Sequence, residues 1–535
     1  MLLKVISAYT WRVNSDEPQH LHIVWAWANG LLQYRDVFDN HTPLFHMLFA
    51  PIYSLFGERA DILVLMRLTV IPLFFMGLWA VYLIGKALYS RHIGLWAMIF
   101  TALYPRFFLT AGEFRADDLW MVPWLLALAI LVQKQLRASH LFVAGLLLGT
   151  ALSISMKTGL LLCALGLATL IVTFLQRNSQ PLCIRKYAIN TISLLVGFTL
   201  VPLALILFFS LQGAWASMYY GVIQHNIVPG LGNWKHLQNC VWPIAVIVSL
   251  IIGGTYLIQC RSTDHSLRKR RLMIFLTYGF AMLGLYGAWP LITNQDFMPL
   301  TPLIIIVATG LLLQTRGGES KKASQYARTT AILAVIALLE FSTLVTKAEP
   351  WNPHTLAENS LLAEVLQLTH PGETIMDFKG ETVFRQRPFF YALEDVTLKR
   401  IELGMIKDSI PEDMTNARTT VATLNNSRFS ARDQEFLGQN FLPIGHLRVL
   451  GQYLAAPNTK ANSNFNIRVP SSYAVIAAQG TANGWLDGIP YHGPRKLDAG
   501  PHTFRSANPD THRLAIIWAP AIERGFSPFA PGRSS

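Results

Sequence analysis

Acidic and histidine side chains crowd the front of the chain, in the stretch "NSDEPQHLHIVWAWANGLLQYRDVFDNHTPLFH" at residues 14–46. A carboxylate such as that of Asp16 is ionised at neutral pH and can take a proton from an attacking hydroxyl or amine, which is typically worth about 10²–10⁴-fold in rate. Asp16, Glu17 and His20 share one helix face through their i,i+3 and i,i+4 spacing, so they are also a weak candidate site for a divalent cation. The acids and histidines of the stretch are Asp16, Glu17, His20, His22, Asp36, Asp39, His41 and His46.

The segment "SDEPQH" has a simpler structural interpretation as the start of a helix. Ser15 or Asp16 would cap the helix, and Pro18 is tolerated in its first turn. Acids in a first turn also interact favourably with the helix dipole. The sequence alone leaves helix capping and chemistry open for this segment.

A second group of ionisable and polar side chains follows further along the chain. Several of its members lie beside apolar segments, where an ionised group is costly and usually functional. Structural roles are open alternatives: Arg115 as a loop ion pair with the acids that follow it, Lys157 as an interfacial lysine that extends toward water, and His225 as a loop histidine. The group consists of Glu113, Arg115, Asp117 and Asp118 in "TAGEFRADDLW", together with Lys157, His225, Gln295 and Asp296.

The composition identifies the setting of these residues as a membrane. The 535 residues are 52% hydrophobic and only 14% charged, with a mean hydropathy of +0.35, whereas soluble domains carry about 25% charged residues. Residues 1–346 hold 25 Lys and Arg against 13 Asp and Glu, and the remainder holds 19 against 18. Of the net charge of +13, +12 therefore lies in the membrane half, and we expect no nucleic-acid partner. The four cysteines have no paired spacing, so neither a zinc site nor a disulfide framework is predicted.

Ten apolar runs are long enough to cross a bilayer. The connections between them alternate between basic loops, with 16 Lys and Arg, and acidic loops that hold nine of the 13 acids of residues 1–346. Because cytoplasmic loops are the ones rich in Lys and Arg, the acidic loops and the C-terminal region are predicted to lie outside. The runs are 62–85, 93–109, 118–134, 140–156, 158–175, 188–210, 241–259, 272–290, 299–315 and 328–346.

Ten spans would also place the N-terminus outside, yet "MLLKVISAYTW" has the character of the end of a helix. We therefore expect that a first span is missing upstream of this sequence. The predicted regions are 1–61, a first outer loop with juxtamembrane helices and the acidic motif; 62–346, the transmembrane domain; 347–456, a small extracytoplasmic α/β domain; and 457–535, an extracytoplasmic β-sandwich-like domain.

The C-terminal region is predicted in more detail from local patterns. "ENSLLAEVLQLTH" is typical of an amphipathic helix, and "ETIMDF", "TTVATL" and "LRVLGQYL" are typical of strands. Short alternating runs with Gly, Asn and Asp turns follow from "FNIRV" to "RLAIIWAP" and favour the sandwich. We expect this region to bind an acceptor glycan or a partner.

The loop motifs resemble those of the GT-C fold glycosyltransferases, and most closely the bacterial members of the family that includes protein O-mannosyltransferases and the aminoarabinose transferase of lipid A. The resemblance rests on "DE" at 16–17, "GLLQYRDVFDNHTPLFH" at 30–46, "EFRADD" at 113–118 and "DFMPLTPL" at 296–303, and covers about residues 12–310. The chain departs from the family twice. The first family helix is missing, and "NHTPL" with His41 stands where relatives often have Lys before a "PPL" turn.

The resemblance implies an integral protein of the bacterial inner membrane that transfers a sugar from a polyprenyl-phosphate carrier to an acceptor glycan, lipid or protein at the periplasmic or extracellular face. In the inverting mechanism that it implies, Asp16 is the candidate base and Glu17 positions hydroxyls. Arg115, Lys157 and His41 are the candidates for binding the leaving lipid phosphate, since Arg offers a bidentate fork and Lys a point charge. The resemblance implies no particular cofactor, and a divalent cation is an open alternative. Candidate contacts to acceptor or sugar are Asp39, Asp117, Asp118, His225 and Gln295.

Two other classes of protein stay open. A transporter or flippase of a lipid-linked glycan would also need apolar helices, but the ionisable residues gather at one face rather than along the spans. A non-catalytic membrane protein that binds carbohydrate would leave the acid-rich first loop unexplained beyond its solvation.

Overall fold

The structure is a computed structural model that describes residues 1–175, 184–232, 237–261, 264–313, 322–425, 427–454, 462–479, 481–507 and 513–529. Cys183 and parts of the predicted basic loops, at 176–183, 262–263 and 314–321, lie outside the described residues. The chain divides into two compact units. Unit 1 holds Met1–Val13, Asn40–Phe49 and Val64–His354, and unit 2 holds Asn14–Asp39, Ala50–Leu63 and Thr355–Ser535.

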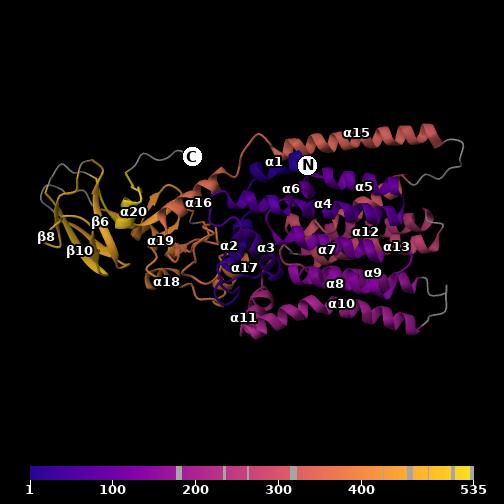
Figure 1. Cartoon of the computed structure of the whole chain (residues 1–535), viewed down its shortest axis with the longest axis horizontal. Coiled ribbons are helices and arrows are strands. Elements are labelled where there is room, and N and C mark those ends of the chain that lie inside the picture. Colours follow the sequence, from indigo (N-terminus) through magenta and orange to yellow (C-terminus); the bar gives the residue numbers. More distant parts are fainter. Residues whose placement is uncertain are drawn as a thin grey trace. The chain divides into compact units, whose positions relative to one another are not determined.

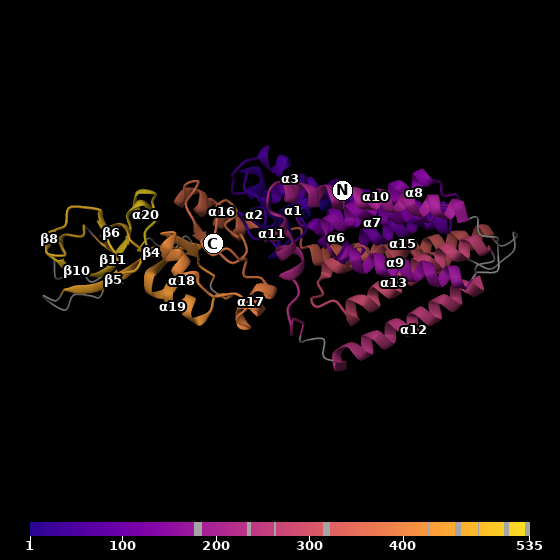
Figure 2. The same ribbon diagram turned by 90° about the horizontal axis from the view of Figure 1, so that it is seen from below.

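Unit 1 is helical, and its long helices lie side by side (Figures 1 and 2). In the described residues, most of each of the ten predicted apolar runs is helical, and the run at 93–109 is broken at Pro105, which begins a second helix. The helices are α1 (Leu2–Thr10), α4 (Ile62–Leu88), α5 (Arg91–Leu103), α6 (Pro105–Thr110), α7 (Ala116–Leu131), α8 (Ala138–Ile154), α9 (Thr158–Phe174), α10 (Ile184–Leu211), α11 (Trp215–Tyr219), the π-helical turn η1 (Tyr220–Gln224), α12 (Leu237–Arg261), α13 (His265–Gly287), the 3-10 turn η3 (Asn294–Phe297), α14 (Thr301–Leu313) and α15 (Lys322–Ala348).

Four helices are long and apolar enough to cross a membrane: α4 at Ile62–Leu88, α10 at Ala188–Leu211, α12 at Val241–Arg261 and α15 at Thr329–Ala348. Within unit 1, only 11–17% of the apolar windows of the last three helices is buried, against 56% for α4. An apolar surface of this extent is stable in lipid rather than in water. The apolar helices thus identify an integral membrane protein. The other apolar helices have 17 residues or fewer, so the number of crossings stays a prediction.

Glycines bring α8 and α10 into close contact. A Cβ added at Gly145 would lie 2.0 Å from the Leu194 carbonyl oxygen, and one added at Gly197 would lie 2.1 Å from the Phe142 carbonyl oxygen. Small residues at such crossings are typical of helices that pack in membranes, where close backbone approach supplies the packing energy.

Unit 2 combines two segments of the first 63 residues with the C-terminal region. From the N-terminal part it takes α2 (Glu17–Ala28) and the second half of α3 (Leu44–Ser54). Phe38 packs edge-on against Tyr391 with ring centroids 4.9 Å apart. The C-terminal helices are α16 (Leu356–Leu368), α17 (Asp395–Glu402), α18 (Ile410–Asn416), α19 (Ala431–Asn440) and α20 (Ala519–Glu523).

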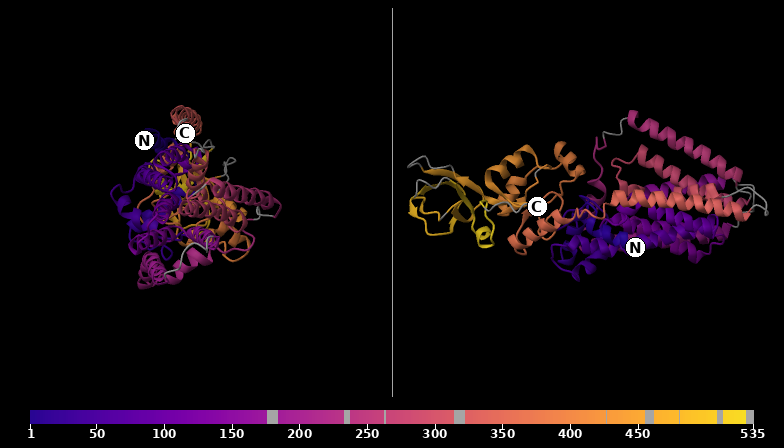
Figure 3. Two further views of the ribbon diagram at one scale, coloured as in Figure 1. Left: turned by 90° about the vertical axis from the view of Figure 1, so that its right-hand side faces the viewer. Right: turned by 90° about the horizontal axis from the view of Figure 1, so that it is seen from above.

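The strands of unit 2 form a seven-stranded and a four-stranded sheet (Figure 3). The larger has the order β1-β2-β4-β11-β6-β9, with β3 paired to β4, and the smaller the order β5-β10-β7-β8. All pairs are antiparallel except β1 with β2. The strands are β1 (Ile375–Met376), β2 (Val421–Thr423), β3 (Phe441–Ile444), β4 (Leu447–Leu454), β5 (Ser463–Ile467), β6 (Ser471–Ala477), β7 (Gly484–Leu486), β8 (Ile489–Pro490), β9 (Arg495–Leu497), β10 (Gly500–Ser506) and β11 (Leu514–Trp518).

The amphipathic helix and the three strands predicted at the start of this region are confirmed as α16, β1, β2 and β4. The sheet, however, runs across the boundary expected at residue 456. The first half of β4 pairs with β2 and β3, and its second half pairs with β11, where Leu454 is opposite Leu514. The structure also groups residues 14–39 with the C-terminal region, whereas the sequence-based division places them in a separate first loop.

Candidate functional site

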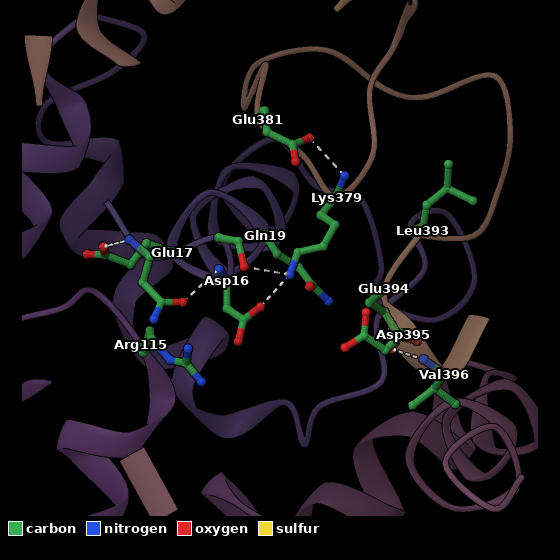
Figure 4. Close-up of polar contacts among 12 residues, drawn as sticks. Asp16, Glu17, Gln19, Arg115, Lys379, Glu381, Leu393, Glu394, Asp395 and Val396 are labelled. Carbon is green, nitrogen blue, oxygen red and sulfur yellow. Dashed lines mark hydrogen bonds and ion pairs between the residues drawn. The ribbon is translucent and has the colours of Figure 1, made fainter. Parts of the chain in front are cut away.

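Asp16 lies at the N-cap position of α2 and forms an ion pair with Lys379 (Figure 4). In the described part of the chain, its carboxylate accepts no capping hydrogen bond from the first turn of α2. The Lys379 ammonium also lies 3.3 Å from the Ser15 hydroxyl oxygen. The Lys379 side chain is 5% exposed and that of Asp16 is 26% exposed. Helix capping therefore does not account for the Asp16 side chain, which is held by a buried cation and stays partly open to solvent.

Lys379 belongs to the Asp377 loop, which we define as residues 377–387, immediately after β1. The carboxylate of Asp377 accepts hydrogen bonds from the backbone amides of Gly380 at 3.0 Å and Thr382 at 2.9 Å, and from the Thr382 hydroxyl at 2.6 Å. It also forms an ion pair of 3.3 Å with Arg387. The Glu381 carboxylate accepts from the Lys379 backbone amide at 2.9 Å. These contacts fix the loop backbone on both sides of Lys379.

The same loop lies directly against α2. Gly380 has φ +104°, and a Cβ there would be 2.6 Å from the His22 Cβ. Val383 has φ +50°, and its carbonyl accepts a hydrogen bond of 2.7 Å from His22 Nδ1. Burial lowers the pKa of His22 to about 4, with the nearby Arg387 adding to the decrease. His22 is thus a neutral imidazole with its proton on Nδ1, and it serves as a structural contact between α2 and the loop.

Glu17 and Asp39 both belong to unit 2, and their side chains are buried. A carboxylate oxygen of Glu17 accepts from the Asn14 backbone amide at 2.8 Å. The two carboxylate oxygens of Asp39 accept from the side-chain amides of Gln19 at 3.1 Å and Gln33 at 2.7 Å. Both acids therefore hold the structure around α2, and their predicted contacts to acceptor or sugar stay predictions.

In unit 1 the two predicted phosphate-binding cations are each paired with a carboxylate. Arg115 Nε lies 3.0 Å from Asp117, with both side chains less than 10% exposed, and Lys157 forms an ion pair with the buried Asp296. Although burial acts to lower it, the Asp296 and Asp117 carboxylates raise the pKa of Lys157 above its usual value. Both groups are therefore cations, as phosphate binding requires.

Of the remaining predicted side chains of unit 1, Gln295 and Asp118 lie in the same segments as these pairs, whereas His225 and His41 lie elsewhere in the chain. Gln295 donates a hydrogen bond of 2.6 Å to Glu113, and Asp118 is buried at the start of α7. His225 is buried at the end of η1, with its ring 5.9 Å from that of Tyr220. His41 is half-buried.

A metal site is not assembled in the described ranges. No three His, Cys, Asp or Glu side chains there come together in a group that could hold a metal ion. The weak candidate at Asp16, Glu17 and His20 is without support from this structure.

The structure therefore joins Arg115 with Asp117, Lys157 with Asp296, and Asp16 with Lys379. That Asp16 approaches Arg115 and Lys157 stays a prediction, because the carboxylate belongs to one unit and the two cations to the other. Lys379 was missed by the sequence analysis. The available signal was a charged loop, "DFKGETVFRQR", directly after a predicted strand.

Neither a protein-family model nor a curated protein matches this sequence. Among solved structures, the chain is similar to ArnT from Cupriavidus metallidurans bound to undecaprenyl phosphate, with 12% identity, coverage of 84% of this chain and 96% of that one, and a TM-score of 0.54. The apo state of the same protein gives a TM-score of 0.53 with the same identity and coverage. AglB from Archaeoglobus fulgidus, in complex with an inhibitory peptide and a dolichol-phosphate, has 12% identity, coverage of 79% and 68%, and a TM-score of 0.44. The likeness to ArnT shows the fold, so this chain has the GT-C fold of membrane glycosyltransferases.

Proposed function

We propose that this protein is a glycosyltransferase that moves a sugar from a polyprenyl-phosphate donor to an acceptor glycan, lipid or protein. The reaction takes place at the outer, periplasmic or extracellular, face of a bacterial inner membrane. The proposal is supported by the fold shared with ArnT, whose structure holds undecaprenyl phosphate, and by apolar helices suited to the lipid tail of such a donor. The fold alone does not define a reaction, so the proposal depends on the site residues.

The observation that carries the proposal is the partly exposed carboxylate of Asp16, held by Lys379 at the start of α2. In the proposed reaction Asp16 takes the proton from the acceptor hydroxyl or amine while the acceptor attacks the anomeric carbon. The bond from that carbon to the phosphate oxygen breaks, and the lipid phosphate leaves with the electron pair. A single displacement of this kind inverts the anomeric configuration.

The leaving phosphate needs cations, and we assign this role to Arg115 and Lys157, with His41 as a third candidate. The donor phosphate would share Arg115 with Asp117 and Lys157 with Asp296, since each cation has further N–H donors beyond its observed pair. Glu17, Asp39, Asp117, Asp118, His225 and Gln295 remain the proposed contacts to sugar or acceptor. No metal is required in this scheme, and a divalent cation is an open alternative.

The proposal is tested by deleting the gene and analysing the cell-envelope glycans and the polyprenyl-phosphate sugars by mass spectrometry. The expected result is the loss of one sugar from a glycan, lipid or protein, together with the accumulation of that sugar on its polyprenyl-phosphate carrier. Restoration by the wild-type gene ties both changes to this protein. If the sugar were lost from the envelope while the polyprenyl-phosphate sugar stayed at the inner face of the membrane, the protein would be a transporter instead. Unchanged envelope glycans and carrier lipids would contradict the proposal.

A further inference from the structure

The candidate base forms an ion pair with the C-terminal region, for which the sequence predicted binding of an acceptor glycan or a partner. We infer that Lys379 is a positioning residue that holds the Asp16 carboxylate in place for proton transfer, an inference that rests on the proposed role of Asp16 as base. The C-terminal region then supplies a part of the reaction machinery through the Asp377 loop.

The Lys379 ammonium is buried. Its side chain is only 5% exposed, and its ammonium contacts the Asp16 carboxylate and the Ser15 hydroxyl. Burying an ammonium costs free energy unless it is paired with an anion and hydrogen-bonded. The loop therefore delivers the ammonium to the Asp16 carboxylate, and the Glu381 carboxylate of the same loop adds a second negative charge near it.

The rigidity of the loop makes this contact precise enough to orient a side chain. Asp377 binds the amides of Gly380 and Thr382, and Glu381 binds the backbone amide of Lys379 itself. Gly380 lies so close to α2 that no Cβ fits without movement. A reacting group held by packed and hydrogen-bonded neighbours keeps its geometry, and misplacement by about 1 Å can cost about 10²-fold in rate.

The charge of Lys379 has a second effect on Asp16. A cation beside a carboxylate favours the ionised form, which is the form that can accept a proton. Removing the cation should therefore raise the pH at which the base becomes protonated. A Lys379 side chain that acted without touching the Asp16 carboxylate would not move this pH, because the ionisation of a carboxylate responds to charges close to it.

The experiment uses purified full-length variants mixed with membranes of the deletion strain, which supply the accumulated donor and the acceptor, and follows sugar transfer by mass spectrometry between pH 5 and 9. We expect Lys379→Met to lower the transfer rate about 10- to 100-fold and to move the acid limb of the pH profile upward by about one pH unit. Lys379→Arg should recover part of the rate and the original acid limb, since it keeps the charge. The matched control is Lys399→Met, which removes a lysine paired with the exposed Glu402 on α17 and should change neither quantity.

The double variant Asp16→Asn/Lys379→Met separates this inference from the proposed function. If Lys379 acts through Asp16, the double variant is no slower than Asp16→Asn alone. The inference would be overturned if Lys379→Met slowed transfer by the same factor in the Asp16→Asn background as in the wild type. It would also be overturned if the acid limb of Lys379→Met did not move. Either result would leave Asp16 as the base. A fully active Asp16→Asn would instead overturn the assignment of the base.

Discussion

The ammonium of Lys379 pairs with the carboxylate of Asp16, although 363 residues separate them in the chain. The pair joins the start of α2 to the Asp377 loop, and it lies next to two further contacts, between His22 and Val383 and between His22 and Gly380. The N-terminal acidic segment is therefore built into unit 2 by the C-terminal region.

Gly380→Ala should disrupt this arrangement. The added Cβ would meet the His22 Cβ at 2.6 Å, in a backbone conformation of φ +104° that L side chains rarely adopt. We expect a loss of stability of about 1–3 kcal/mol from the backbone alone, and a larger loss with the clash. The measurement is thermal unfolding of the full-length protein in detergent. Gly372→Ala is the matched control, because Gly372 has φ +89° but open space around it. Equal losses in the two variants would show that the close approach to His22 is unimportant.

His22 should make the stability depend on pH in the acid range. Its pKa is lowered by burial to about 4 in the folded protein, against about 6.5 when unfolded. The unfolded state therefore binds more protons between these values, so the free energy of unfolding should fall as the pH decreases from 6.5 to 4, by a few kcal/mol. His22→Gln should flatten this part of the profile, and His370→Gln, at an exposed turn, should not. A slope unchanged in His22→Gln would show that His22 does not cause it.

Arg385 should be needed for the folding of unit 2. It is 2% exposed and binds the Glu58 carboxylate at 3.0 and 3.2 Å, the Thr369 hydroxyl at 3.0 Å and the Thr369 carbonyl at 3.0 Å. Arg385→Met should destabilise the protein by about 1–3 kcal/mol, because it leaves the buried Thr369 carbonyl without this donor and removes the cation paired with the 29% exposed Glu58. Arg385→Lys should recover little, since a point charge cannot replace the fork.

The control for Arg385 is Arg432→Met. Arg432 and Glu412 form an ion pair in which both side chains are about half exposed, and such pairs contribute about 0–1 kcal/mol. Both variants are compared by thermal unfolding, and a similar small effect of the two would contradict the role assigned to Arg385.

Lys157→Met should weaken the binding of undecaprenyl phosphate to the full-length protein by about 10- to 100-fold, the range expected for one hydrogen bond to a charged group. The variant also leaves Asp296 buried without its cation, so thermal unfolding is measured in parallel. Lys157→Met/Asp296→Asn should regain stability without regaining affinity. If affinity returns with stability, Lys157 has only a structural role.

Local patterns in the sequence were sufficient to predict much of the secondary structure. The ten apolar runs fall on helices, and α16, β1, β2 and β4 appear where amphipathic or alternating patterns predict them. These predictions succeed because hydrophobic periodicity is set by near neighbours in the chain.

Long-range pairing could not be predicted in the same way. Nothing in a periodic pattern specifies that β4 pairs with β11 across the expected domain boundary, or that Lys379 reaches Asp16. For the candidate site, the residue types at Arg115 and Asp117 were enough to suggest their ion pair, since they are two residues apart. The partners of Asp16 and Lys157 depend on tertiary packing, which decides which distant loops meet.

The most direct test of the account is the rate of sugar transfer by Asp16→Asn, measured with purified full-length protein and membranes of the deletion strain. The control is Asp61→Asn, which removes a half-exposed carboxylate paired with Arg59 in the same unit. The account predicts that Asp16→Asn, well folded by thermal unfolding, transfers sugar about 10²–10⁴-fold more slowly than wild type, while Asp61→Asn transfers at the wild-type rate. Transfer by Asp16→Asn at the wild-type rate would contradict it.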